Sequence, residues 1–248
     1  MLIRSHEERI YKRTQNRYRL LKFLRDETWS DALNLGLILG LSKSGAYKTL
    51  SSLCREQLII SVYIEELGRK IYGITPSGLL YAWDENENME NRSYFQPNRV
   101  KPLMMRHHLD LQLARVNAER AGWNSWKLAS QLPKNMPKRP DAEVTSLRGQ
   151  LIAVELERTV KTKKRYESIF SIYLQAIKRS EYDAVHYVCP DQGFAKRLLR
   201  LFTTIDALPV AGVRVPITDR HREKFPVYCL ENWPPIEKEK YDWSHRQN

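Results

Sequence analysis

The chain has 248 residues, of which 42% are hydrophobic, and this is enough to bury a core and to exclude wholesale disorder. Lys and Arg number 41 and Asp and Glu number 29, so the formal net charge is +12. Because Lys and Arg neutralise phosphates and release condensed counterions, this excess favours a polyanionic partner, above all nucleic acid. The competing interpretation is a basic protein whose charge serves solubility alone.

Neither the cysteines nor the hydropathy pattern points to an extracellular or membrane protein. Cys54, Cys189 and Cys229 lie far apart and do not have the spacing of zinc ligands. The N-terminus lacks the apolar run of a signal peptide, and no stretch is apolar and long enough to span a membrane. We therefore expect a cytoplasmic protein without membrane insertion, with its cysteines reduced.

The first part of the chain predicts three helices followed by two strands. The spacing of the apolar residues places these elements at residues 16–29, 32–39, 45–56, 58–64 and 70–74. Three helices and a β-hairpin are the pattern of a winged helix-turn-helix, which binds DNA. A small helical packing domain without DNA contact is the alternative.

The third predicted helix carries polar and basic side chains opposite its apolar face. Such side chains suit phosphate and base-edge contacts in a DNA major groove. Two more cations lie directly before the second predicted strand and at its first position. The predicted DNA-binding residues are Lys43, Ser44, Tyr47, Lys48, Thr49, Arg69 and Lys70. Winged helices often pair to read two half-sites, so a homodimer is compatible with this interpretation, although the sequence does not decide it.

The second part of the chain changes character after a polar, Asn-rich stretch at 84–102, which is typical of a linker. Beyond it, helices and strands are predicted in the order α-β-β-β-α-β-α-β, which indicates a mixed sheet with helices on its faces. We therefore expect an α+β or α/β protein with a winged helix-turn-helix domain over 1–83, the linker over 84–102 and a second domain over 103–248.

An acidic group follows the most apolar predicted strand. Alternate residues of a strand share a face, so Glu155 and Glu157 point the same way, and Asp141 begins the neighbouring strand at the same end of the sheet. Adjacent carboxylates repel unless something positive lies between them. Three convergent carboxylates suit a hard cation such as Mg²⁺ or Mn²⁺, which can activate water and polarise a phosphodiester. The alternative is a set of solvated carboxylates neutralised by Arg158 and Lys161.

These motifs come in a definite order along roughly residues 16 to 189. The predicted winged helix is followed by His107-His108-Leu109, then Arg139-Pro140-Asp141-Ala142, then Val154-Glu155-Leu156-Glu157-Arg158-Thr159, then Lys163-Lys164-Arg165-Tyr166. This order resembles the PD-(D/E)xK nuclease superfamily. More narrowly, it resembles the MobC-type plasmid mobilisation relaxases of the replication-relaxation family.

The resemblance implies a restriction-endonuclease-like domain that cuts one DNA strand at an origin of transfer with a divalent metal. Asp141 and Glu155 would be metal ligands. Glu157 occupies the position where many superfamily members have a lysine, and it would act as a third ligand or a general base. Lys161 or Lys164 could supply the missing positive charge to the phosphate. The family also implies an accessory mobilisation protein and a coupling ATPase as partners.

Four further side chains are candidates for an auxiliary role: His107, His108, Arg158 and Tyr166. His107 and His108 could reach the site from a flanking helix, although a histidine pair on a helix surface is more often ordinary. Tyr166 lies close to the acidic residues in the sequence. The rival hypothesis, from a different class, is a non-catalytic DNA-binding protein: a transcriptional repressor or relaxosome accessory protein that keeps the nuclease-like fold as a scaffold.

Overall fold

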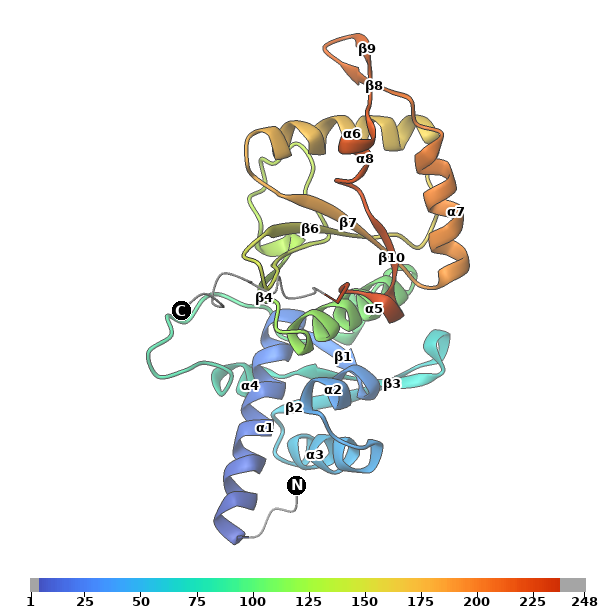
Figure 1. Cartoon of the computed structure of the whole chain (residues 1–248). Helices are drawn as coiled ribbons and strands as arrows, with labels where there is room; N and C mark the ends of the chain where they lie inside the picture. Colours follow the sequence, from blue (N-terminus) through green and yellow to red (C-terminus); the bar gives the residue numbers. More distant parts are fainter. Residues whose placement is uncertain (1–4, 237–248) are drawn as a thin grey trace, which may run out of the picture. The chain divides into compact units, whose positions relative to one another are not determined.

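The computed structural model describes residues 5–236, and the chain divides into two compact units, unit 1 over Met1–Val116 and unit 2 over Asn117–Asn248. Both units combine helices with β-sheet, so the protein is α+β, as expected (Figure 1). Residues 1–4, on which the expectation about a signal peptide falls, and residues 237–248 lie outside the described part of the chain.

Unit 1 begins with three helices that each start at a polar cap. They are α1 (His6–Glu27), α2 (Ala32–Leu39) and α3 (Lys43–Arg55). The capping side chains of Ser5, Asp31 and Ser42 each accept a hydrogen bond from the backbone amide three residues further on. The first helix begins well before the predicted start at residue 16, because its first turns are polar and exposed and therefore show no apolar period.

An antiparallel sheet of three strands completes the centre of unit 1. Its strands are β1 (Trp29–Asp31), β2 (Ile59–Ile64) and β3 (Arg69–Ile74), in the order β1-β3-β2. Strands β2 and β3 fall where two strands were predicted, and a short 3-10 turn and Gly68 join them, with φ at 61° for this glycine. The three helices and the sheet enclose one core that includes Leu20, Leu24, Leu35, Leu50, Leu53 and Ile74.

Unit 1 extends past the expected linker. Helix α4 (Pro76–Leu80) and a 3-10 turn (Pro97–Arg99) precede α5 (Pro102–Arg120). The buried ring of Phe95 lies directly against Gly73, where an added Cβ would come within 2.0 Å of the ring. Met105 packs into the same cluster, and Arg115 forms ion pairs with Asp26 and Glu27. Residues 84–116 therefore pack on the N-terminal unit, so the compact units meet after Val116 and not at the predicted linker.

Unit 2 is built on a mixed sheet of five strands. Its strands are β4 (Asn124–Leu128), β5 (Ala142–Thr145), β6 (Leu151–Leu156), β7 (Ala184–Cys189) and β10 (Val227–Cys229), in the order β10-β7-β6-β5-β4. The pairs β4–β5 and β5–β6 are antiparallel, whereas β6–β7 and β7–β10 are parallel. Strand β6 is central and almost wholly buried, as its apolar sequence predicts.

Helices cover the sheet of unit 2. Helix α6 (Lys163–Lys178) connects β6 to β7 and lies along one side of the sheet, and α7 (Gln192–Thr203) follows β7 (Figure 1). The core beneath them is aromatic, with Phe170 stacked on Phe225 at 3.8 Å between ring centroids. The rest of the unit comprises a 3-10 turn at Ala129–Gln131, a hairpin of β8 (Ala207–Val210) and β9 (Val213–Pro216), α8 (Asp219–Arg222) and a 3-10 turn at Leu230–Asn232.

Within residues 5–236, the helices are all too short or too polar to cross a membrane. Cys54, Cys189 and Cys229 are free thiols, and the latter two are buried.

Candidate functional site

Asp141 and Glu155 lie opposite each other at one edge of the unit 2 sheet. Ala142 pairs with Val154 in the β5–β6 register, so the preceding Asp141 comes opposite Glu155. The backbone amide of Asp141 donates to the Val154 carbonyl at 3.0 Å. One carboxylate oxygen of Asp141 accepts a hydrogen bond from the amide of Leu156 at 2.8 Å. These two hydrogen bonds fix the Asp141 carboxylate beside the end of β6.

Glu155 is a buried carboxylate, 6% exposed, with two partners of its own. The Lys138 ammonium forms an ion pair with it, and the Tyr173 hydroxyl donates a hydrogen bond to it. Burial raises the pKa of Glu155 because it disfavours the charged form; the Lys138 charge opposes this rise and the Asp141 charge adds to it. Ionisation of Glu155 in the fold therefore carries an energetic cost that the Lys138 ammonium partly offsets.

Glu157 follows β6 and is buried in the same way. Its carboxylate accepts hydrogen bonds from the Lys161 ammonium and the Tyr166 hydroxyl, and its backbone amide donates to the Val188 carbonyl at 2.9 Å. Burial, and then the hydrogen bond to Glu157, raise the pKa of Tyr166 above its usual value, so this tyrosine keeps its proton. Tyr166 and Tyr173 are two helical turns apart on α6, so both glutamates meet the same face of that helix.

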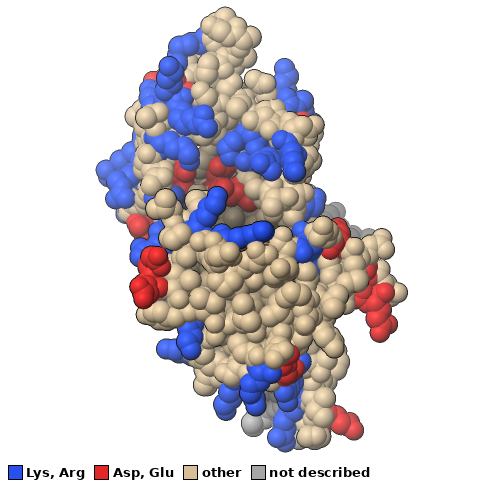
Figure 2. Space-filling model, turned by 180° about the vertical axis from the view of Figure 1, so that it is seen from behind, with Lys and Arg blue, Asp and Glu red and all other residues tan. Residues whose placement is uncertain are grey.

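A third buried glutamate repeats the arrangement on β5. The Lys127 ammonium lies 3.1 Å from a Glu143 carboxylate oxygen, and the Tyr182 hydroxyl donates to Glu143 at 3.3 Å. One face of the sheet therefore carries three groups that we call the Glu–Lys–Tyr triplets: Glu143–Lys127–Tyr182, Glu155–Lys138–Tyr173 and Glu157–Lys161–Tyr166. Figure 2 shows a small group of Asp and Glu side chains with Lys and Arg side chains around it.

Two carboxylates, those of Asp141 and Glu155, lie together at this edge. Within residues 5–236, no group of three or more His, Cys, Asp or Glu side chains lies close enough together to hold a metal ion. The third expected carboxylate, Glu157, lies two residues beyond Glu155 and has its own lysine and tyrosine. Mg²⁺ and Mn²⁺ often bind through one or two carboxylates, several waters and substrate phosphates, so Asp141 and Glu155 are the residues that could hold such an ion. The ammonium of Lys138 supplies positive charge at this point of the structure.

The other predicted residues of unit 2 lie in different surroundings. Lys161 reaches a carboxylate, whereas Lys164 is exposed in the first turn of α6. The pKa of Glu167 is lowered mainly by its hydrogen bond with Arg214, and the charge of Lys164 lowers it further. Arg158 is half-buried directly after the acidic segment.

The histidine pair belongs to the part of α5 that lies in unit 1. The ring of His108 contacts the Trp29 ring at 4.5 Å between centroids, and its Nε2 lies 2.8 Å from the Gln112 side-chain nitrogen. His107 precedes it and is half-buried. Within unit 1, His108 thus has the contacts of a packed side chain.

Sequence reasoning missed Lys138, Tyr173 and the Glu143 triplet. The alternation of a strand places Glu143 on the same face as Asp141, and this signal was available. The seven-residue spacing of Tyr166 and Tyr173 marks one face of α6, but aromatic residues at that spacing are also typical of a core. Lys138 lies in an irregular loop, where no periodicity indicates the direction of a side chain.

In unit 1, α3 presents one face to solvent. Lys43, Ser44, Tyr47 and Lys48 are exposed, while the opposite face of the helix is buried. Thr49 is half-buried, and its hydroxyl donates to the Gly45 carbonyl at 3.1 Å, so it is less available for an outside contact than the other four.

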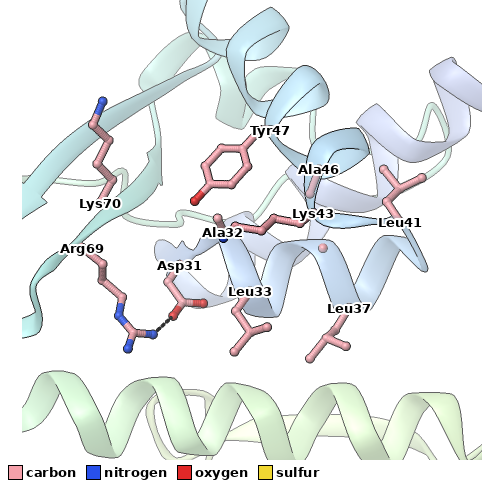
Figure 3. Close-up of a pocket in the computed structure, with 11 residues that line it drawn as sticks. Asp31, Ala32, Leu33, Leu37, Leu41, Lys43, Ala46, Tyr47, Arg69 and Lys70 are labelled. Atoms are coloured by element: carbon pink, nitrogen blue, oxygen red, sulfur yellow. Dashed lines mark hydrogen bonds and ion pairs between the residues drawn. The ribbon is translucent and has the colours of Figure 1, made fainter.

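A pocket of about 380 Å³ lies beside this face, between α2, α3 and β3 (Figure 3). Leu33, Leu37 and Leu41 line its apolar part. Arg69 turns to the carboxylate of Asp31, 2.8 Å away, whereas the ammonium of Lys70 points away from this ion pair. Lys43 and Lys70 form no ion pair with any described residue, so both cations can meet an external anion.

Comparisons with protein-family models, with curated proteins and with solved structures found no match to this chain.

Proposed function

We propose that the protein is a metal-dependent DNA endonuclease: unit 1 is a winged helix-turn-helix that binds double-stranded DNA, and Asp141 and Glu155 hold the Mg²⁺ or Mn²⁺ with which one strand is cut. The observation that supports this most strongly is the pairing of Asp141 with Glu155 across β5 and β6. Placing the half-buried Asp141 carboxylate beside the buried one of Glu155 is costly, and a cation between them offsets that cost. Lys138 offsets part of it in the structure.

The arrangement of unit 1 supports the DNA-binding part of the proposal. An α-helix fits the major groove of B-DNA, and α3 presents Lys43, Ser44, Tyr47 and Lys48 on its exposed face. The β2–β3 hairpin carries Lys70 near the same pocket, where an unpaired ammonium suits a backbone phosphate. Helix α3 would read bases, and the hairpin would hold the phosphate backbone.

The arrangement of unit 2 supports the nuclease part. Along the chain, the order α5-β4-β5-β6-α6-β7 matches the α-β-β-β-α-β order of the PD-(D/E)xK resemblance, and on this basis unit 2 is assigned a nuclease-like fold in this proposal. When bound, the metal would supply a Lewis acid for the phosphodiester and lower the pKa of water. The Leu156 amide orients Asp141 for this task.

Glu157 stands where many members of the superfamily have a lysine, so another lysine has to supply positive charge to the phosphate. The Lys138 side chain is 23% exposed, so its ammonium can move from Glu155 to a phosphate oxygen of the substrate. Lys161 and Tyr166 hold the Glu157 carboxylate on the face that carries the site. By its resemblance to mobilisation relaxases, the enzyme would nick at an origin of transfer, with an accessory mobilisation protein and a coupling ATPase as partners.

A second candidate function is non-catalytic DNA binding, as in a repressor or relaxosome accessory protein. One observation favours it: each buried glutamate already has a lysine and a tyrosine, so the Glu–Lys–Tyr triplets satisfy the buried charges without a metal. On this view the acidic edge stabilises the fold and unit 1 carries the activity.

A nicking assay separates the two functions. The DNA bound by the full chain is first selected from a random duplex pool, and the selected sequence is cloned into a supercoiled plasmid. With Mg²⁺ or Mn²⁺ the wild type should convert this plasmid to the open circle. Asp141→Asn and Glu155→Gln should slow conversion about 100-fold or more, because several kcal/mol of charge stabilisation depend on the ligands. Glu143→Gln is the matched control and should nick normally.

Binding has to be measured on the same variants. If Asp141→Asn nicks as fast as the wild type, the site assignment is wrong. If the wild type shifts the selected DNA but cleaves it with neither metal, the second candidate function is correct.

A further inference from the structure

Tyr187 is a buried tyrosine whose hydroxyl has no hydrogen-bond partner among the described residues. It lies on β7, opposite Glu155 in the β6–β7 register, and is 1% exposed. Buried polar groups in proteins are nearly always hydrogen-bonded, because an unsatisfied hydroxyl loses its contacts with water without replacement. A hydroxyl of this kind beside a group of carboxylates therefore needs an explanation.

The ring of Tyr187 is held in place on several sides. Its centroid lies 6.2 Å from that of Tyr166, 6.1 Å from that of Phe170 and 4.9 Å from that of Phe202. The hydroxyl thus cannot turn toward solvent without repacking this aromatic core. Burial raises the pKa of Tyr187, and the charges of Glu155 and Glu157 raise it further. The hydroxyl therefore keeps its proton and can act as a hydrogen-bond donor.

The other tyrosines near these carboxylates behave differently. Tyr166, Tyr173 and Tyr182 each donate their hydroxyl hydrogen to the glutamate of a Glu–Lys–Tyr triplet. The hydroxyl of Tyr187 is hydrogen-bonded to no described residue, although Tyr187 lies opposite Glu155 in the β6–β7 register and therefore on the same face of the sheet. Its acceptor is therefore a group other than the described side chains and backbone.

We infer that Tyr187 is a positioning residue whose hydroxyl donates a hydrogen bond to a water molecule that completes the divalent-metal site of Asp141 and Glu155. This inference rests on the proposed function and deepens it. A donor fixed in the aromatic core would restrict the orientation of such a water. Mutation of groups that hydrogen-bond to the ligands of a metal typically changes metal affinity 10- to 100-fold.

The test compares Tyr187→Phe with wild type and with Tyr182→Phe as the matched control, all in the full chain. Unfolding in urea is followed with EDTA present, and Mn²⁺ binding is measured by isothermal titration calorimetry. Tyr187→Phe should unfold at the same or a higher urea concentration than wild type, because it loses no hydrogen bond to the protein. It should bind Mn²⁺ about 10-fold more weakly. Tyr182→Phe should show the reverse: a lower unfolding midpoint and wild-type Mn²⁺ affinity.

Three results would overturn the inference in distinguishable ways. Wild-type Mn²⁺ affinity in Tyr187→Phe would show that the hydroxyl does not serve the site. A clearly lower unfolding midpoint in EDTA would show that the hydroxyl has a partner in the protein itself. Absence of Mn²⁺ binding by the wild type would overturn the proposed metal site, and this inference with it.

Discussion

Replacing Glu155 by Gln should abolish metal binding and leave the fold at least as stable as that of the wild type. Glu155 is buried, and its charge lies beside that of Asp141, so the folded protein holds this charge at a cost. Glutamine keeps the size of the side chain and an oxygen that can accept the Tyr173 hydroxyl. Asp141 alone is a poor site for a divalent cation.

The size of the stability change follows from two opposing contributions. Loss of the charge-assisted hydrogen bond from Lys138 costs about 1.5–3 kcal/mol, whereas removal of a buried carboxylate relieves a desolvation cost of several kcal/mol. Lys138 is not stranded, because its ammonium also donates to the Arg139 carbonyl at 2.7 Å and its side chain is partly exposed. We expect a net gain of about 0–2 kcal/mol for Glu155→Gln at neutral pH.

The pH dependence of this gain has a definite sign. The pKa of Glu155 in the folded protein is raised above its ordinary value of 4.5. As the pH rises above 4.5, the unfolded chain releases the proton first, so the wild type loses stability until the folded carboxyl also ionises. Glu155→Gln lacks this loss. Its advantage over wild type should therefore be small near pH 4 and larger at pH 8.

The assay is urea unfolding in EDTA at pH 5 and pH 8, together with Mn²⁺ titration of the same samples. Glu143→Gln is the control, since Glu143 also has a lysine and a tyrosine but is not the residue opposite Asp141. It should retain Mn²⁺ binding. A loss of more than about 2 kcal/mol at pH 8 in Glu155→Gln, together with preserved Mn²⁺ binding, would refute the reasoning, because Glu155 would then be a structural residue.

Three further predictions concern single features of the structure. Lys138→Met leaves Glu155 without its cation and should destabilise the fold by about 1–3 kcal/mol. In urea unfolding the loss should be larger at pH 8 than at pH 5, and an equal loss at both pH values contradicts this. Lys48→Ala with Lys70→Ala should reduce the slope of log affinity against log salt by about 2 for all DNA sequences in fluorescence anisotropy, and an unchanged slope contradicts phosphate contact. Burial lowers the pKa of His186 from 6.5 to about 4, so the unfolded chain takes up this proton first as the pH falls. The free energy of unfolding should therefore decrease by about 3 kcal/mol between pH 6.5 and pH 4. A pKa of His186 near 6.5 in an NMR titration contradicts this.

The parts of the fold that follow from local periodicity could be predicted from the sequence. Helix α2 was predicted with the same bounds, 32–39, because apolar spacing and caps mark both of its ends. Strand β1 was missed, since three residues show no period and Trp29–Asp31 becomes a strand only by pairing with β3. The unit boundary was also misplaced: the polar composition of 84–102 does not reveal that Phe95 packs on Gly73.

At the sheet edge that carries Asp141 and Glu155, too, local periodicity was predictable and three-dimensional packing was not. Strand alternation and the adjacency of two strands were enough to place Asp141 near Glu155. Which lysine reaches which glutamate could not be predicted, because the loop before β5 delivers Lys138 through an irregular path. The unsatisfied hydroxyl of Tyr187 likewise depends on three-dimensional packing that no sequence pattern shows.

A Mn²⁺-soaked crystal of the full chain, measured for anomalous scattering, tests the central claim most directly. We expect one anomalous peak between the carboxylates of Asp141 and Glu155, with oxygen distances of about 2.1 Å and the Lys138 ammonium moved away from Glu155. Unchanged contact between Lys138 and Glu155, with no peak at this edge of the sheet, would contradict the claim that these two carboxylates hold the metal.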